Sequence, residues 1–480
     1  MLFNSLEFAI FLILVFFAYW ALPHRLRPLL LMVSSFYFYG RWNPVYLLLI
    51  IAMILSSYGC ARWIGRLKQR KETTVKQQKF AVFVNCAFCL GLLTWFKYIN
   101  FLIDSFRALM NAFGAGIPDF MIDVLLPVGI SFYTFQTISY VIDVYREKLK
   151  PETDIVCYAA FISFFPQLVA GPIERSTNLL PQLKEEKHFD YDEAVYGMRL
   201  MAWGFYKKLV IADVLVVYVD RVYGELHSHT GVDLLITSFF FMIMIYCDFS
   251  GYSDIAIGTA RLFGIKLMKN FNSPFLSHSN EEMWRRWHIS LSTWFRDYVY
   301  IPLGGNRKGR MRKYINIVIT FFLSGLWHGA AWHFVVWGTM QGVVQVLEDI
   351  GRSTLTALKK NRIFFVCSVI FTTVFFQVSV VFFRAPSVSD AFYLLGHMFD
   401  GFGSAGYFTN HMQLWPLPAF IIAVSILILF AYDLASLKTD VIAWVGTRPK
   451  LLRWAISLGI LMMIILFKAS DRTEFVYFQF

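Results

Sequence analysis

Charged residues are scarce in this sequence, and their scarcity excludes most soluble folds. Only 16% of the 480 residues are Asp, Glu, Lys or Arg, whereas 57% are hydrophobic. A soluble domain has about 25% charged residues. Apolar runs such as residues 8–22, 418–434 and 454–467 have, with their flanks, the length that crosses a hydrocarbon core of about 30 Å. The composition therefore predicts an all-α, polytopic membrane protein in contact with the lipid bilayer.

Motifs for metal or nucleotide chemistry are missing. The six cysteines lie mostly in apolar runs, and Cys86 and Cys89 lack the second Cys/His pair of a zinc site; we interpret all six as small core hydrophobes. HExxH, P-loop and G-x-S-x-G patterns are absent, which argues against a metalloprotease, an ATPase and an α/β-hydrolase. On a continuous helix, His333 would lie about 140° around from His328, too far to share a metal with it. We expect no metal and no bound cofactor.

Basic residues outnumber acidic ones and are clustered. The net charge is +12, and the densest basic runs are residues 66–79 and 306–313. Both runs fit cytoplasmic loops under the positive-inside rule, with anionic lipid as their partner. A second hypothesis for 306–313 is that it also meets the phosphates of an anionic donor. Nucleic-acid binding is not expected, because no basic soluble domain is present.

Two segments of the chain are too interrupted to be simple membrane-crossing helices. Residues 161–175 are broken by Pro166, Gly171 and Pro172, and residues 248–264 are polar and contain glycine. At membrane depth such backbone is tolerated only when it is buried in protein or lines a wet cavity. We interpret both segments as re-entrant elements.

Elsewhere hydropathy predicts membrane-crossing helices, among them 80–104 and 124–143, with an external loop at 105–122 between them. No internal repeat and no linker divides the chain. We therefore predict one integral-membrane domain over 1–480.

The stretch that begins at Trp284 has the period of an amphipathic helix. Helical spacing places two stripes on different faces, one of Trp284, Trp287, Leu291, Trp294 and Tyr298, and one of Arg285, His288, Ser292 and Arg296. An interfacial helix anchored by tryptophan would have this pattern. His288 then faces either lipid headgroups or an internal cavity, and the pattern leaves both open.

A second helix carries a polar stripe in an apolar run. Asn316, Thr320, Ser324 and His328 recur every four residues and point into a bundle interior or a cavity. An ionisable residue in a helix long enough to span a membrane is costly to bury, so it is first considered as part of a functional site. A neutral imidazole is suited to removing a proton near pH 7. The alternative is a structural histidine with satisfied hydrogen bonds. Because Gly325 and Gly329 allow close approach of backbone or substrate, we single out His328 as the catalytic residue.

Several stretches resemble one family closely, namely residues 127–146, 164–175, 204–213, 246–258, 283–307, 324–338 and 475–480. They are similar to the membrane-bound O-acyltransferases, in the branch that contains the alginate and peptidoglycan O-acetyltransferase membrane subunits. The resemblance implies a ring of about 11 transmembrane helices plus re-entrant elements around a central tunnel, with a catalytic core at about 127–350. It maps the family's essential histidine to His328, in LWHGA, and a second polar residue to His288, in RRWHISLS.

The resemblance also implies the reaction. Acetyl-CoA would be the cytoplasmic donor substrate, and hydroxyls of an extracytoplasmic polysaccharide, such as alginate or peptidoglycan, would be the acceptor. An extracytoplasmic SGNH-type partner would complete the transfer, and the location would be the bacterial cytoplasmic (inner) membrane. Catalysis would use His328 as general base together with His288. The tunnel or substrate contacts would be Asn316, Thr320, Ser324, Trp327 and Arg296.

The sequence ends on FVYFQF (475–480), an aromatic segment that follows Arg472 and Glu474. It resembles the F-x-Y-F ending of the small peptide that works with the teichoic-acid D-alanyl transferase of the same superfamily. Tyr477 would then be a covalent acyl carrier. An aromatic anchor at the membrane interface is the structural alternative.

Three other functions remain open at this point. A D-alanyl transferase that uses a carrier-protein thioester would have related chemistry. A transporter without bond-making chemistry would also show broken helices and central polar residues, although no inverted repeat is evident. A pure scaffold would not need the polar stripe that ends at His328.

Overall fold

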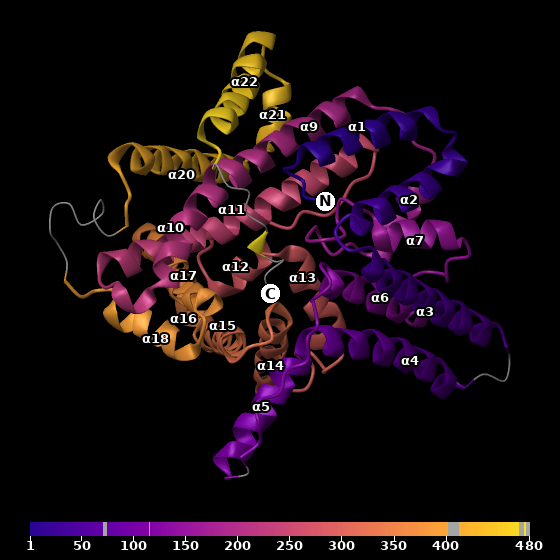
Figure 1. The fold of residues 1–480 in the computed structure, drawn as a ribbon, viewed down its shortest axis with the longest axis horizontal. Helices are drawn as coiled ribbons and strands as arrows, with labels where there is room; N and C mark the ends of the chain where they lie inside the picture. Colours follow the sequence, from indigo (N-terminus) through magenta and orange to yellow (C-terminus); the bar gives the residue numbers. More distant parts are fainter. Residues whose placement is uncertain (71–73, 115, 402–411, 470–474, 477–480) are drawn as a thin grey trace. The chain divides into compact units, whose positions relative to one another are not determined.

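The computed structural model describes residues 1–480 except 71–73, 115, 402–411, 470–474 and 477–480 (Figure 1). Its described residues form helices and no strands, and six helices are long and apolar enough to span a membrane. The prediction of an all-α, polytopic membrane protein is confirmed. The ring of about 11 helices around a tunnel stays a prediction.

Contacts divide the chain into two compact units, residues 1–197 with 256–268, and residues 198–255 with 269–480. Whether they act as one domain stays a prediction. Two helices have residues in both units, α9 (Tyr191–Tyr206) and α11 (Val232–Leu262).

The first unit is built from helices of the N-terminal part of the chain. They are α1 (Leu6–Ala21), η1 (His24–Leu26), α2 (Arg27–Gly40), α3 (Pro44–Gln69), α4 (Val75–Leu93), η2 (Thr94–Tyr98), α5 (Ile99–Ala112), α6 (Ile130–Tyr145), α7 (Ile155–Ser163) and α8 (Ser176–Lys184). Its core is aromatic: the ring of Phe165 lies 5.1 Å from that of Phe11 and 5.8 Å from that of Phe38.

The interrupted segment 161–175 leaves the helix after Ser163 and becomes helical again only at Ser176. Phe164 and Phe165 are fully buried, and the Phe165 N–H donates to Ser35 Oγ at 3.0 Å. Irregular backbone is thus buried in protein here, as the sequence predicts. Its depth in a bilayer stays a prediction.

Two predicted boundaries in this unit are wrong. The helix expected to stop at 104 continues through the π-helical η2 and α5 to Ala112, so 105–112 is not a loop. The helix expected from 124 begins only at Ile130. Gly129 precedes it with φ +78°, and an added Cβ there would lie 2.6 Å from the Leu168 carbonyl oxygen, so tertiary packing fixes this start.

The second unit holds the remaining helices. They are η3 (Lys207–Ala212), α10 (Asp213–Gly224), η4 (Leu226–Ser228), η5 (Pro274–Leu276), α12 (Asn280–Arg286), α13 (Ile289–Phe295), η6 (Arg296–Tyr300), α14 (Arg310–His328), α15 (Trp332–Ile350), α16 (Arg352–Leu358), α17 (Arg362–Arg384), α18 (Val388–His397), α20 (Pro416–Ser436), α21 (Val441–Gly446) and α22 (Lys450–Phe467). The apolar runs 418–434 and 454–467 lie in α20 and α22, two of the candidate spans.

The predicted re-entrant break at 248–264 is wrong, because α11 continues without interruption from Val232 to Leu262. Gly251, one of its two glycines, serves close packing instead of a turn. A Cβ added at Gly251 would lie 2.8 Å from the Gly204 carbonyl oxygen. Its polar residues are accommodated by ion pairs, such as Lys207 with Asp254 at 2.7 Å.

The interpretation of all six cysteines as core residues is wrong for Cys367, which is exposed on α17, and Cys86 is only partly buried. The exposed side of α17 is itself apolar, with Phe371 and Ile370 also exposed. An apolar residue on a membrane-spanning helix need not face the protein core, because lipid is as apolar as the core.

Candidate active site

His288 lies at a break between two short helices. The continuous amphipathic helix expected through this stretch is wrong, since α12 ends at Arg286 and α13 begins at Ile289, with His288 in the left-handed region at φ +44°. Asn270 holds the break: its carbonyl accepts the Ile289 N–H at 2.9 Å, and its Oδ1 accepts the Ser290 hydroxyl at 2.8 Å.

The structure decides between the two environments that the sequence leaves open for His288. Its side chain is fully buried inside the protein and does not face headgroups. Its ring lies 4.6 Å from the ring of Phe249 and 6.2 Å from that of His328. His288 is outside the six candidate spans. Burial lowers its pKa, and His328 lowers it further, so the imidazole is neutral.

His328 is the last residue of α14 and is 3% exposed. Its ring is enclosed by aromatic rings at 5.0 Å (Trp327), 5.0 Å (Trp337) and 5.4 Å (Phe383). The two histidines predicted to act together therefore lie side by side in an aromatic enclosure, and Trp327 belongs to the same enclosure, at 5.9 Å from His288.

A glycine contact places this end of α14 against α15. A Cβ added at Gly325 would lie 3.0 Å from the Gly338 Cα, and one added at Gly338 would lie 2.7 Å from the Gly325 Cα. A distance of 2.7 Å is shorter than Cβ atoms make in protein structures, so a side chain at Gly338 would push the two helices apart. The prediction that Gly325 allows a close approach of backbone is confirmed, and the backbone that approaches it belongs to α15.

His333 does not continue the helix of His328, so the expected 140° relation is wrong. The chain leaves α14 at Gly329 and begins α15 at Trp332, and His333 Nδ1 pairs with the Phe382 carbonyl at 2.9 Å. Among the described residues, no three His, Cys, Asp or Glu side chains are grouped to hold a metal ion.

The polar stripe of α14 has two parts. Asn316 is fully buried and donates to the Leu303 and Gly305 carbonyls at 3.3 and 2.9 Å, so it fixes the preceding loop. Thr320 and Ser324, one and two turns further on, do line a cavity. The structure brings three of the predicted tunnel or substrate residues, Arg296, Thr320 and Ser324, to the lining of this cavity. Asn316, Trp327, His288 and His328 are not among its lining residues. That any of them contacts a substrate stays a prediction.

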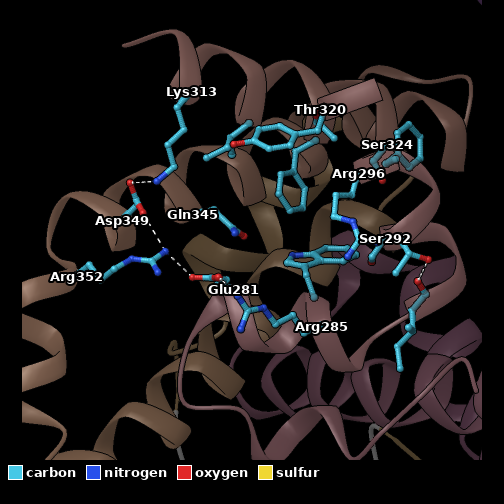
Figure 2. A pocket seen from close by; sticks show the side chains of 17 residues that line it. Glu281, Arg285, Ser292, Arg296, Lys313, Thr320, Ser324, Gln345, Asp349 and Arg352 are labelled. Atoms are coloured by element: carbon cyan, nitrogen blue, oxygen red, sulfur yellow. Dashed lines mark hydrogen bonds and ion pairs between the residues drawn. The ribbon is translucent and has the colours of Figure 1, made fainter. Parts of the chain in front are cut away.

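This cavity has a volume of about 600 Å³ and is lined by α12, α13, η6, α14, α15 and the start of α16 (Figure 2). Four basic side chains line it, namely Arg285, Arg296, Lys313 and Arg352, and two acidic ones, Glu281 and Asp349. Four positive charges against two negative ones leave a formal excess of two positive charges. Apolar wall residues include Trp284, Phe321 and Ile317.

Ion pairs join the opposite sides of the cavity. Asp349 pairs with Lys313 at 2.6 Å and with Arg352 at 2.9 Å, and Arg352 also reaches Glu281 at 2.7 Å (Figure 2). Arg285 also contacts Glu281. The carboxylates thereby orient the cations around the space, and the excess positive charge favours an anionic occupant.

Aromatic rings separate the cavity from the histidine pair. Trp284 lines the cavity, its ring lies 5.8 Å from that of Trp337, and the Trp337 ring in turn contacts His328. Trp284 is held by its indole N–H, which donates to Gln341 Oε1 at 3.2 Å. Because Ser324 precedes His328 by one turn of α14, the cavity wall and the catalytic candidate share one helix.

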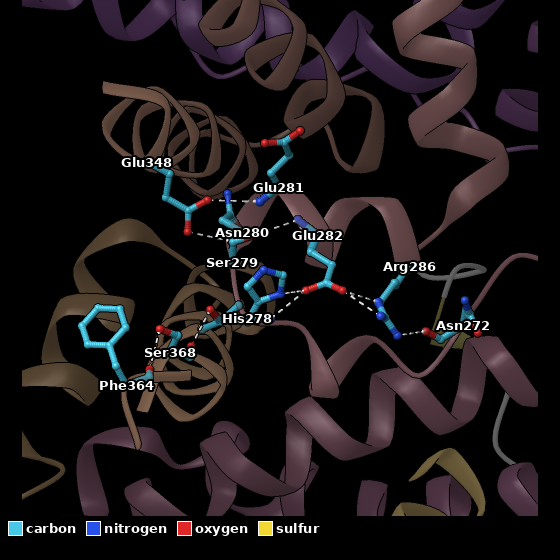
Figure 3. Close-up of polar contacts among 11 residues, drawn as sticks. Asn272, His278, Ser279, Asn280, Glu281, Glu282, Arg286, Glu348, Phe364 and Ser368 are labelled. Carbon is cyan, nitrogen blue, oxygen red and sulfur yellow. Dashed lines mark hydrogen bonds and ion pairs between the residues drawn. The ribbon is translucent and has the colours of Figure 1, made fainter. Parts of the chain in front are cut away.

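A polar network fixes α12 and with it this wall (Figure 3). Glu282 contacts His278 and pairs with Arg286 at 2.7 Å, while Glu348 accepts the backbone N–H of Asn280 at 2.8 Å. Burial by itself would raise the pKa of Glu282, but the His278 N–H and the Arg286 guanidinium outweigh it and hold the pKa below its usual range. A charged Glu282 therefore anchors the helix.

Sequence reasoning missed the residues that complete the enclosure and the cavity. Phe249 and Phe383, which contact His288 and His328, are ordinary apolar residues in ordinary apolar runs. Glu281 and Asp349 gave a weak local signal, since each lies three or four residues before an arginine with which it pairs. Tyr477, the predicted acyl carrier, lies outside the described residues.

Comparison with known proteins agrees with this arrangement. The sequence profile of the membrane-bound O-acyltransferase family matches residues 149–384, which include both histidines and the cavity. The chain is 38% identical to a probable alginate O-acetylase of Pseudomonas putida over 401 residues, 83% of this chain and 80% of that protein. It is 30% identical to a peptidoglycan O-acetyltransferase of Helicobacter pylori over 94% of this chain and 91% of that protein.

A more distant relative is a teichoic acid D-alanyltransferase of Bacillus subtilis, 30% identical over 228 residues, which are 45% of this chain and 57% of that protein. The family match falls on the segments that build the histidine enclosure and the cavity. With its apolar helices, the chain is a multi-pass membrane protein. It belongs to the membrane-bound O-acyltransferase family.

Proposed function

We propose that this protein is an O-acetyltransferase of the bacterial cytoplasmic membrane that takes acetyl groups from acetyl-CoA and passes them on for O-acetylation of an extracytoplasmic polysaccharide. The observation that carries the proposal is the position of a cationic cavity one helical turn from a buried histidine pair. The names of the relatives, alginate O-acetylase and peptidoglycan O-acetyltransferase, support an acetyl group and a polysaccharide acceptor.

The donor would occupy the cavity with its phosphates at the cations. Arg285, Lys313 and Arg352 offer charge-assisted hydrogen bonds, which are the stronger kind. Lys313 belongs to the basic run 306–313, so the run predicted to meet phosphates contributes a cavity residue. The apolar wall near Trp284 would take the less polar pantetheine arm and direct the thioester toward His328.

His328 would act as the general base. It takes the proton of the attacking hydroxyl, the new C–O ester bond forms, and the thioester C–S bond breaks. The CoA sulfur leaves as a thiolate and receives the proton from the His328 imidazolium, so that CoA is released as the thiol and His328 is neutral again. A positioned base of this kind contributes about 10²–10⁴-fold to a rate. His288, at 6.2 Å between ring centroids, would position the same substrate.

The attacking hydroxyl is assigned in this proposal to Tyr477. Its phenol would become an acetyl ester, and a second hydroxyl, from an SGNH-type partner or from the polysaccharide, would then displace the tyrosine and restore it. Direct attack by an acceptor hydroxyl is the alternative route. Replacing Tyr477 by Phe removes the nucleophile and keeps the ring, so it separates the two.

The test uses the purified full-length protein in detergent with acetyl-CoA labelled in the acetyl group. We expect label on the protein, lost in Tyr477→Phe, while the variant keeps the thermal midpoint of the wild type. Label that persists in Tyr477→Phe would exclude this carrier. A D-alanyl carrier-protein thioester is supplied in parallel, and its use in preference to acetyl-CoA would overturn the assignment of the donor.

A further inference from the structure

A buried ion cluster in the second unit has no part in the chemistry above. The Lys208 ammonium lies 2.5 Å from Asp248 Oδ1 and 2.8 Å from Asp213 Oδ1, and all three residues are at most 2% exposed. Two carboxylates thus share one ammonium. Burying such charges costs several kcal/mol per ion unless hydrogen bonds compensate them, so the contacts of the remaining carboxylate oxygen are informative.

The second oxygen of Asp248 accepts a hydrogen bond from the C-terminal segment. The donor is the backbone N–H of Val476, at 3.0 Å. The preceding side chain, Phe475, lies with its ring centroid 4.4 Å from Lys208 Nζ and packs edge-on against Tyr252 at 4.3 Å. Phe475 and Val476 are 2% and 6% exposed. A cation–π contact and a charge-assisted hydrogen bond therefore hold two adjacent residues.

This attachment point is beside the histidine enclosure. Asp248 is followed in α11 by Phe249, whose ring lies 4.6 Å from the ring of His288. One turn of α11 thus holds the C-terminal segment through Asp248 and contacts His288 through Phe249. The next residue after Val476 in the sequence is Tyr477.

We infer that Lys208, Asp213 and Asp248 form a clamp that holds residues 475–476 of the C-terminal segment beside the histidine enclosure, and that this attachment serves acyl transfer. The clamp residues are positioning residues and touch neither donor nor acceptor. The role in acyl transfer rests on the proposed function, whereas the attachment of residues 475–476 to the ion cluster does not depend on it.

Val476→Pro removes the hydrogen bond, because proline lacks the N–H that Asp248 accepts; it also fixes φ at this position and restricts the backbone of Phe475. Val476→Ala keeps the N–H and is the matched control. We expect Val476→Pro to lower protein labelling by acetyl-CoA at least about 10-fold, as the loss of a hydrogen bond to a charged group predicts, with Val476→Ala near wild type. Equal labelling in the two variants would overturn the clamp.

A second measurement does not depend on activity. Hydrogen exchange at the Val476 amide should be slow in the wild type and at least about 10-fold faster in Phe475→Ala, because the ring covers the cluster. Exchange at the unprotected rate in the wild type would contradict the clamp. If the amide is protected but no protein takes up label, the proposed function fails and the attachment stands.

Discussion

Replacing Gly338 by Ala perturbs the helix crossing that positions His328. The added Cβ would lie 2.7 Å from the Gly325 Cα and closer still to the carbonyl oxygen of Phe321, and these are backbone atoms that cannot move without their helix. Overpacking of this kind typically costs about 1–3 kcal/mol. Because His328 is three residues beyond Gly325 in α14, separation of the helices also displaces the imidazole.

A catalytic group misplaced by about 1 Å can lose about 10²-fold in rate. We therefore expect Gly338→Ala to lower kcat for acetyl-CoA thioester cleavage by about 10–100-fold, and to lower the thermal midpoint in detergent. Gly459→Ala in α22 is the control, since a Cβ there meets nothing within 4 Å. The reasoning is refuted if Gly338→Ala and Gly459→Ala have the same kcat and the same midpoint.

Two further predictions concern charge. Burial lowers the pKa of His288 in the folded protein, whereas in the unfolded chain this histidine takes up a proton near the ordinary pKa of about 6.5. Protonation therefore favours the unfolded chain, and the free energy of unfolding should fall as the pH drops below about 6.5. Thermal scans from pH 7 to pH 5 should show a steeper loss in wild type than in His288→Asn, by at most about 1.4 kcal/mol per pH unit; parallel curves would contradict a neutral, buried imidazole. Lys313→Gln should raise KM for acetyl-CoA about 10-fold, because it removes one charge-assisted contact with the phosphates. The control Lys438→Gln, at an exposed residue outside the cavity lining, should leave KM unchanged. Equal KM values in the two variants would show that the phosphates do not bind in this cavity.

The sequence was sufficient where a pattern repeats along one helix. The four-residue spacing from Asn316 to His328 predicts α14, and its apolar surroundings mark His328. The apolar runs 418–434 and 454–467 predict α20 and α22, because membrane-spanning helices satisfy their own backbone hydrogen bonds.

Sequence patterns were insufficient where a segment distant along the chain determines the local conformation. The helical period runs through Trp287 and His288 without interruption, yet Asn270 pulls the backbone into a left-handed turn there. Gly251 of α11 looks like a helix breaker in the sequence, but it permits close contact with Gly204. The cavity draws its charges from five helical segments, and no local pattern encodes that Asp349 lies between Lys313 and Arg352.

The most direct test of the account is cleavage of acetyl-CoA by purified protein, wild type against His328→Ala, with His333→Asn as the control. His333 is also buried, but its ring pairs with the Phe382 carbonyl and not with the histidine enclosure. We predict that His328→Ala loses about 10²–10⁴-fold in cleavage rate, as removal of a general base requires, while His333→Asn stays within a few-fold of wild type. Equal cleavage by wild type and His328→Ala would contradict the assignment of His328 as the catalytic base.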